Sequence, residues 1–489
     1  MIEIQARQHD NFSVEFKFGY NCKLDGEKDK FSVNTWIFVP NSLDINPENY
    51  GKELFYRDIK SNVRLITPTY LLKDIAQETS LPLASLKKAF ENVAKYPSES
   101  SMNAYEYHLK MFAAIFKSAL RDHVACLDTA PSIETAECQV DDYVESLRQV
   151  LTMVRALYKI IDVPTVSARV RNSFLMCDEL MSHTMVLTTT RMIKDLDASE
   201  HSQKLSDVRR KFVSFILQER DYMASMGYEK LGGTPEQDRQ LLFHHGMLKK
   251  YVESELYIRL DKKKDGVAVE QLYYSIAAGV AMIFATGVAW HTQVRYGNIT
   301  WPLFVVLVVS YMLKDRIKDL LRYYFAHKLG NKYFDKKATV AIGDRKIGVI
   351  KEGFDFISKA KTPDVVMAMR EQASFVEDES SIFEEKILLY RKHVELSDSA
   401  LAQVDAYPMS GINEIVRLHM GSFIHKMDNP EVPIDTIDTD GKMASWSVQR
   451  IYYVNVLFQL QHDGKAEYRH FRITMTRNGV QDITEINRG

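Results

Sequence analysis

The sequence has few residues of the types that mark several functional classes. Only four of its 489 residues are cysteines, Cys22, Cys126, Cys138 and Cys177, and none belongs to a CxxC pair or has a histidine at zinc-finger spacing. Scattered cysteines fit a reducing compartment better than a disulfide framework. We therefore expect buried, inert thiols, and neither a bound metal nor a cofactor.

The common catalytic signatures are also missing. The sequence has no GxxxxGK[ST] loop and no GxGxxG turn, whose backbone amides would wrap a nucleotide phosphate. It has no HExxH pair for a zinc protease and no GxSxG elbow for a serine hydrolase. Folds with dispersed catalytic residues are not excluded, so whether the chain is an enzyme is left open.

No charge of one sign dominates. The 63 lysines and arginines are balanced by 65 aspartates and glutamates, for a formal net charge of -2. This gives no overall basic field of the kind that phosphate backbones select, so we expect no nucleic acid partner. The mean hydropathy is slightly negative, which indicates that any membrane portion is a minor fraction of the chain. The first residues lack the pattern of a signal or transit peptide, so insertion is expected to depend on an internal segment.

Long apolar runs are confined to two neighbouring segments. Residues 272–290 are uncharged and about as numerous as the ~20 residues that cross ~30 Å of hydrocarbon. Residues 299–313 would rise only about 22 Å as a helix, so we expect that helix to run from Pro302 to about Leu329 through a basic, amphipathic extension. Together the segments predict a transmembrane helical hairpin at about 272–313. The rival interpretation is a buried helical pair in a soluble domain.

The charges that flank the apolar runs predict an orientation. Basic residues precede the first run and follow the second, whereas the loop between the runs holds only Arg295. Positive charge favours the inner side, so both termini are expected in the cytoplasm of a multi-pass protein of the cell membrane, specifically the bacterial inner membrane. The same basic residues are candidate contacts for lipid headgroups: Lys262, Lys263, Lys264, Lys314, Arg316, Lys318 and Arg322.

Aromatic and small residues add detail to the hairpin. Trp290 and Trp301 bracket the short loop, and Tyr273, Tyr274 and Tyr311 fall at the other end, as expected for anchors at the two membrane interfaces. Small residues recur every four positions and would allow a neighbouring helix to approach closely. Small residues are also common in spanning helices, which explains the stripe equally well. The stripe consists of Ala277, Ala281, Ala285 and Ala289.

Periodicity divides the chain into four regions and predicts an α+β fold that is mainly α. Residues 1–100 form a small α+β region that opens with a β-hairpin made of 12–20 and 31–39, and 101–268 show the apolar spacing of a helical bundle. Residues 269–330 hold the transmembrane hairpin with its basic extension. Residues 331–489 form a C-terminal α+β domain, with a strand pair near 338–350, a helix at about 412–427 and an antiparallel meander. The strands of the meander are expected at 447–461, 466–477 and 480–486. The turns between them are Asp463-Gly464 and Asn478-Gly479.

Two other patterns resemble metal-binding sites, but in both the details disfavour metal binding. His244 and His245 are adjacent, but neighbours on a helix point about 100° apart, so packing is the better interpretation. Residues 435–441 resemble part of a calcium loop, yet Thr436 and Ser447 stand where an Asp and a bidentate Glu belong. We interpret this segment as an ordinary acidic turn.

The leading functional hypothesis is a membrane-anchored cytoplasmic scaffold or signalling component. Its partners would be the lipid bilayer, anionic lipids and either other proteins or further copies of the chain. One alternative is a membrane-bound enzyme acting on a lipid or small metabolite. A second alternative is a subunit of an oligomeric transport or channel assembly, although neither apolar run holds an ionisable residue that would line a conduction path.

Overall fold

The computed structural model shows an α+β protein that divides into two compact units. It describes residues 2–23, 26, 28–127, 133–198, 206–228, 234–297, 301–330, 334–342, 345–371, 385–404, 406–437 and 441–486. One unit comprises Arg64–Tyr257 with Asp405–Ser410 and is helical. The other comprises Met1–Val63, Ile258–Val404 and Gly411–Gly489, and holds the β-sheets and the predicted membrane hairpin.

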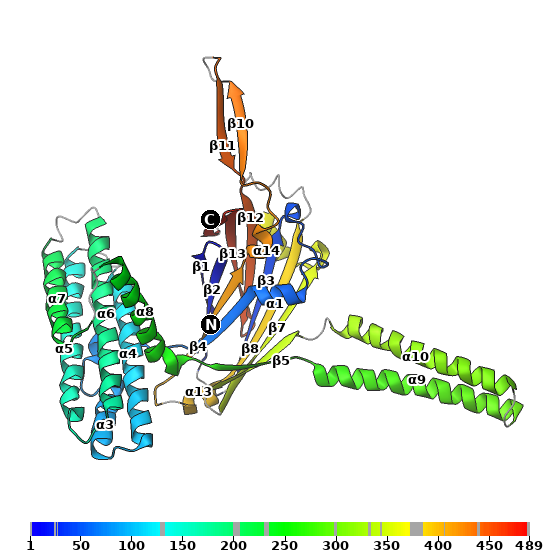
Figure 1. Ribbon diagram of the computed structural model, residues 1–489, viewed down its shortest axis with the longest axis horizontal. Helices are drawn as coiled ribbons and strands as arrows, with labels where there is room; N and C mark the ends of the chain where they lie inside the picture. Colours follow the sequence, from blue (N-terminus) through cyan, green and yellow to red (C-terminus); the bar gives the residue numbers. More distant parts are fainter. Residues whose placement is uncertain are drawn as a thin grey trace. The chain divides into compact units, whose positions relative to one another are not determined.

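The helical unit is a set of long helices that lie side by side (Figure 1). Its elements are α2 (Leu72–Ile75), α3 (Leu81–Lys95), α4 (Glu99–Leu127), α5 (Ile133–Ile161), α6 (Ala168–Ala198), α7 (Ser206–Ser225), α8 (Pro235–Val252) and the 3-10 turn η2 (Glu253–Leu256). Apolar side chains at three-to-four spacing are buried, as Tyr143, Leu147 and Val154 illustrate on α5. The predicted capping box at Thr234 and Gln237 is present at the start of α8.

Two antiparallel sheets pack face to face in the second unit. The four-stranded sheet has the order β1 (Ile2–Asp10), β2 (Ser13–Asn21), β9 (Gly411–His419), β4 (Ile59–Leu65). The eight-stranded sheet has the order β14 (Gly479–Glu485), β13 (Lys465–Thr476), β12 (Tyr452–His462), β3 (Lys28–Val39), β8 (Lys386–Ser397), β7 (Arg345–Ile357), β6 (Lys336–Ile342), β5 (Arg259–Lys264). Aromatic side chains join them: the Phe16 ring lies 5.0 Å from Phe458 and the Tyr20 ring 5.5 Å from Phe31.

Shorter elements complete this unit. A separate two-stranded sheet is formed by β10 (Glu431–Ile437) and β11 (Met443–Gln449). The short helical elements are η1 (Asn41–Leu43), α1 (Lys52–Asp58), η3 (Lys359–Lys361), α11 (Asp364–Glu371), α13 (Asp398–Val404) and α14 (Gly421–Ile424). Helix α11 packs on the eight-stranded sheet through Val366 and Met369, which share a buried cluster with Trp36 and Leu457.

The structure has an N-terminal β-hairpin, but its first predicted strand does not pair with the second predicted strand. Strand β2 pairs with β1 and with β9, whereas the second predicted strand is β3, which lies between β8 and β12 in the other sheet. The predicted C-terminal meander is present as β12, β13 and β14, and the strand pair near 338–350 as β6 and β7. The first predicted strand, 447–461, is too long at its start, because residues 447–449 belong to β11 and β12 begins at Tyr452. The acidic positions 438 and 440 of the rejected calcium loop lie outside the described residues.

The helix predicted at 412–427 is wrong. Residues 411–419 form strand β9, and only Gly421–Ile424 is helical. The buried residues Ile412, Glu414, Val416 and Leu418 alternate with more exposed ones, which is the period of a strand. A long-range partner, β2, satisfies the backbone of this segment and overrides its local helical pattern.

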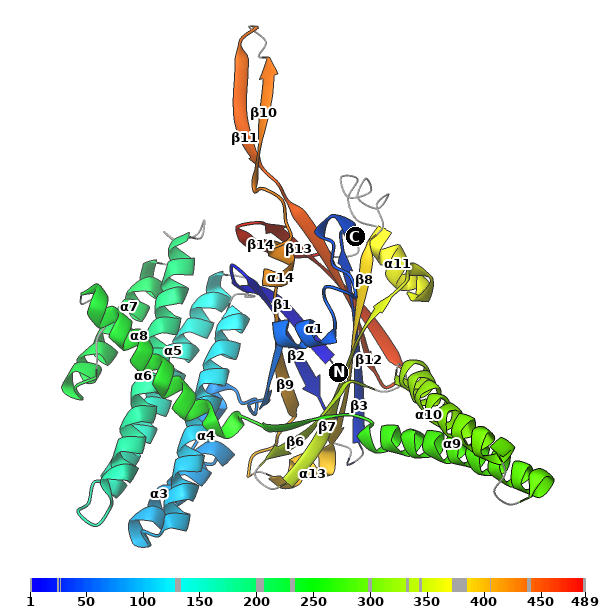
Figure 2. The ribbon, with the colours of Figure 1, turned by 45° about the vertical axis from the view of Figure 1, so that its right-hand side comes forward.

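The predicted membrane segment forms a pair of long helices, α9 (Val267–Tyr296) and α10 (Trp301–Gly330), which pack along each other (Figure 2). Among the described residues, only α9 is long and apolar enough to cross a membrane by length and composition, over Val269–Arg295. Residues 298–300, which include the start of the second apolar run, lie outside the described part of the chain.

Candidate functional site

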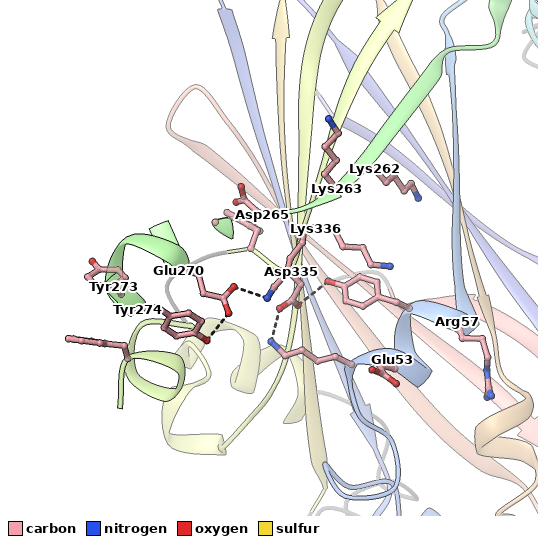
Figure 3. A pocket seen from close by; sticks show the side chains of 16 residues that line it. Glu53, Arg57, Lys262, Lys263, Asp265, Glu270, Tyr273, Tyr274, Asp335 and Lys336 are labelled. Atoms are coloured by element: carbon pink, nitrogen blue, oxygen red, sulfur yellow. Dashed lines mark hydrogen bonds and ion pairs between the residues drawn. The ribbon is translucent and has the colours of Figure 1, made fainter. Parts of the chain in front are cut away.

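A cavity of about 940 Å³ lies where strand β5 leads into helix α9 (Figure 3). Its wall combines side chains from α1, β5, the first turns of α9, the last described turns of α10 and the start of β6. Six cationic side chains face four carboxylates, which gives the lining a net positive charge. The cations are Lys52, Arg57, Lys262, Lys263, Lys264 and Lys336, and the carboxylates are Glu53, Asp265, Glu270 and Asp335.

Asp335 fixes one side of the cavity. Its carboxylate accepts hydrogen bonds from Lys52 Nζ at 2.7 Å and from the Tyr56 hydroxyl at 3.0 Å, and also from the backbone amide of Phe354 at 2.8 Å. Burial lowers the pKa of Lys52, but the Asp335 carboxylate outweighs it and holds that pKa above its usual value. Burial and the same carboxylate raise the pKa of Tyr56. Lys52 therefore remains charged and Tyr56 neutral at physiological pH.

Glu270 repeats this arrangement on the hairpin side. Its carboxylate accepts hydrogen bonds from Lys264 Nζ at 2.8 Å and from the Tyr274 hydroxyl at 2.9 Å. Each of the two acids thus binds one lysine and one tyrosine, as the dashed lines in Figure 3 show. These contacts connect β5 to α9 and α1 to the start of β6.

Three of the cavity's cations are left for a ligand. Lys262 and Lys263 are exposed and form no ion pair with another described residue. Lys336 places its Nζ 3.9 Å from the centre of the Tyr56 ring, a cation–π contact that orients the amine without neutralising it. The cavity therefore offers ammonium groups beside aromatic walls, a combination that suits an anion with an apolar neighbour.

The seven headgroup candidates fall into two groups. Lys262, Lys263 and Lys264 line the cavity, whereas the four on α10 do not. On α10, the Lys314 amine lies over the Tyr311 ring at 4.2 Å, and Lys318 lies 3.5 Å from Asp315. Arg322 lies over the Tyr274 ring at 5.3 Å, and Arg316 is exposed.

Four of the five predicted interface aromatics lie towards the ends of the helical pair, whereas Tyr311 lies in the first half of α10. Tyr273 and Tyr274 line the cavity, and the Tyr273 ring stacks on Phe325 at 5.2 Å. Trp290 and Trp301 lie near the connection between α9 and α10, with 71% and 77% of their surface exposed. Tyr311 is also exposed.

The alanine stripe lies at the contact between the two helices. Ala277, Ala281 and Ala285 are buried, and Ala289 is half-buried. The small side chains allow the backbones to approach.

The histidine pair lies on helix α8 of the helical unit. His244 Nε2 lies 3.1 Å from both carboxylate oxygens of Glu179. The His245 ring packs against His183 with a centroid distance of 5.7 Å.

Metal-ligating side chains do converge elsewhere, at the ends of β2, β3, β8 and β12. One ligand atom from each of Cys22, Asp29 and Asp398 lies within 4.8 Å of the others, and so do those of Asp29, His462 and Asp463. Sequence reasoning missed both this cluster and the role of Asp335. Asp398 and His462 lie hundreds of residues from Cys22 and Asp29, as Asp335 does from Lys52, and no local motif links them.

No protein family model, no curated protein and no solved structure matches this chain.

Proposed function

We propose that this chain is a membrane-anchored scaffold or signalling component, in which the α9–α10 hairpin crosses the bilayer and both folded units lie in the cytoplasm. The observation that carries the proposal is the apolar surface of the hairpin, which no other described part of the chain covers. Only 17% of the most apolar window of α9 is buried. Ile283 and Val294, for example, are 75% and 74% exposed. An apolar surface of this extent is typical of a membrane or partner contact.

The dimensions of α9 support a crossing, and in the proposed hairpin α10 packs along it as the second helix. The 27 residues of the apolar part of α9 span about 40 Å, more than the hydrocarbon thickness of about 30 Å. Helix α10 has a shorter apolar part followed by basic residues. In the proposed arrangement its Lys314 and Lys318 side chains reach the headgroup level along their apolar stems, while the packed alanine stripe holds α10 against α9.

The cavity is then placed at the level of the cytoplasmic headgroups. Tyr273 and Tyr274 open the apolar run of α9 and line the cavity at the same time. We infer that anionic lipid headgroups occupy it, because Lys262 and Lys263 present exposed cationic groups that form no ion pair with a described carboxylate.

Labelling of single cysteines tests the topology. A Gln293→Cys variant should react with an impermeant maleimide in intact cells. Lys263→Cys and Lys337→Cys, which lie opposite each other on β5 and β6, should react only after permeabilisation, and the wild-type chain reports the background from native thiols. Labelling of all three positions in intact cells would overturn the hairpin.

Lipid retention tests the headgroup site. In nanodiscs of phosphatidylglycerol and phosphatidylcholine, the full chain should retain phosphatidylglycerol in preference during native mass spectrometry. Lys262→Gln/Lys263→Gln should lower that preference by about 30-fold, since each lysine contributes about 1 kcal/mol near an anionic surface. Lys359→Gln/Lys361→Gln, on the exposed η3 turn, is the matched control. Equal losses in both variants would mean diffuse attraction without a site.

The scaffold role has its own test. Purification from gently solubilised membranes should return other proteins together with this chain. Recovery of the chain alone, with unchanged membrane complexes in cells that lack it, would contradict a scaffold.

A further inference from the structure

We propose that Cys22, Asp29 and Asp398 form a binding site for a divalent transition metal ion, Zn²⁺ by ligand type, at one end of the β-sandwich. This inference does not depend on the membrane anchor. The three residues come from distant parts of the chain: Cys22 follows β2, Asp29 lies in β3, and Asp398 opens α13 directly after β8.

The spacing of the ligand atoms fits a single ion. The thiol sulfur and one oxygen from each carboxylate all lie within 4.8 Å of one another. In a tetrahedral zinc site with bonds of 2.0–2.3 Å, ligand atoms lie about 3.5 Å apart. The change on binding is therefore at most about 1.3 Å per pair, which side-chain rotation supplies. A thiolate combined with carboxylates suits Zn²⁺ better than Mg²⁺ or Ca²⁺, which take oxygen ligands.

The burial of the acids supports a cation at this place. Asp398 is 1% exposed and Asp29 is 6% exposed, so both carboxylates have little access to water, and the neighbouring Cys22 thiol is half-buried. Two ionised carboxylates that lie this close together repel each other, and burial strengthens the repulsion. A dication bound to both carboxylates and the thiolate offsets this repulsion, and the thiol proton leaves to the buffer.

Neighbouring groups hold Asp29 in position. Its Oδ1 lies 2.9 Å from His462 Nε2, and its Oδ2 accepts a hydrogen bond of 2.9 Å from the backbone amide of Lys23. The His462 ring is itself fixed by stacking on Phe31 at 4.4 Å. Histidine–carboxylate contacts of this kind orient ligands in many metal sites. The fourth coordination position is left for water.

A second possible site overlaps this one. One ligand atom from each of Asp29, His462 and Asp463 also lies within 4.8 Å of the others. Asp463, however, is 42% exposed and forms an ion pair with the Lys23 amine. We therefore assign the ion to the buried thiol-containing site, and the experiment separates the two.

Metal content and cobalt spectroscopy of the full chain test the assignment. The purified wild-type protein should contain about one zinc per chain by elemental analysis. Replacement by Co²⁺ should give a thiolate-to-cobalt charge-transfer band. Cys22→Ser should lose the band and most of the metal, and Asp398→Asn should lose most of the metal. Cys177→Ser, at a buried free thiol of the helical unit, should keep both.

Three results would overturn the proposal. The first is a wild-type chain that holds no metal and takes up no Co²⁺. The second is a Cys22→Ser variant that keeps both the metal and the band. The third is loss of metal in Asp463→Asn together with its retention in Cys22→Ser, which would place the ion at the exposed site. Because a variant can also fail to fold, the wild-type protein provides a further measurement: EDTA should lower its melting temperature, and added Zn²⁺ should restore it.

Discussion

Lys392 is a cation inside the β-sandwich, and its partners explain how it is tolerated there. It is 2% exposed, forms an ion pair with Glu414 and lies 3.5 Å from Glu352. Glu414 is fully buried and also accepts a hydrogen bond of 3.1 Å from the Tyr20 hydroxyl. Burial raises the pKa of Glu352, but the Lys392 ammonium group outweighs this and holds that pKa below its usual value. Glu352 therefore stays ionised beside Lys392.

Removing this lysine should be far more costly than removing the pair. We expect Lys392→Met to lower the free energy of unfolding by about 3–5 kcal/mol, because it leaves buried carboxylates without a cation. Lys392→Met/Glu414→Leu should recover part of that loss. Denaturant titration in mild detergent measures both. A single variant within about 0.5 kcal/mol of the wild type, the range of ordinary surface substitutions, would contradict a buried ion pair.

His470 provides a prediction on pH. Burial, followed by the charges of Arg370 and Arg472, lowers its pKa to about 4 from an ordinary value near 6.5. Between these values the unfolded chain binds a proton that the folded chain does not, so stability should fall as the pH drops from 6.5 to 4. We expect His470 to account for about 3 kcal/mol of the loss in the free energy of unfolding over this pH range.

A variant that does not titrate isolates the contribution of His470 to the pH dependence of stability. His470→Gln keeps a donor near the Asn455 side chain, which lies 2.9 Å from the histidine. Its unfolding free energy should depend less on pH than that of the wild type over the same interval. Identical slopes for the two proteins would show that His470 is not the group that titrates.

His470 also shows a limit of sequence reasoning at the residue scale. Alternation along β13 correctly places Phe471, Ile473 and Met475 in the core, and predicts that His470 faces solvent. It is 2% exposed instead. Helix α11 covers part of that face of the sheet, with Val366 and Met369 packed against it. The strand alone carries no sign of this cover.

Individual elements were predictable where their signals are local. The Asp-Gly turn between β12 and β13 has Asp463 at φ 51° and Gly464 at φ 74°, as a type I′ hairpin turn requires, and two adjacent residues encode it. The predicted Asn-Gly turn before β14 is different: Asn478 has no positive φ, and Gly479, at φ 132°, already pairs with Thr476 in the ladder. The pairing of β2 with β9 joins residues about four hundred positions apart. No local pattern specifies that choice.

The contact between α9 and α10 leads to a prediction for the anchor. Ala281 is 1% exposed, so Ala281→Phe should overpack the helical pair and lower its stability by about 1–3 kcal/mol. Ile283→Phe, at a position 75% exposed on the same helix, is the matched control and should have little effect. Thermal unfolding in mild detergent compares them. Equal effects would mean that the alanine stripe does not hold the two helices together.

The β10–β11 hairpin should be the least protected strand pair. It forms a sheet of its own, and its side chains are largely exposed, including Met443 at 79% and Ile437 at 71%. An isolated two-stranded hairpin is marginally stable in water. Hydrogen exchange followed by mass spectrometry should therefore show faster exchange in β10 and β11 than in β12 and β13. Equal protection would indicate that a partner covers the hairpin.

At the scale of the whole molecule, the chain leaves the sandwich after β4, forms the helical unit and returns at β5. Each unit has its own buried core. We therefore expect calorimetry to show two separable unfolding transitions. Phe174→Ala should lower one of them and Phe471→Ala the other, each by about 3–5 kcal/mol. A shift of both transitions by either substitution would show that the units unfold together.

The strand order also sets the sequence of events during synthesis. Strand β3 lies between β8 and β12, and both of these are translated after α9 and α10. Strand β3 consequently leaves the ribosome before β8 and β12 are synthesised. It stays without these neighbours while the two helices emerge. In the proposed topology, delivery of the hairpin to the bilayer precedes closure of the sandwich, so the translocation machinery meets a nascent chain whose β-domain is still open.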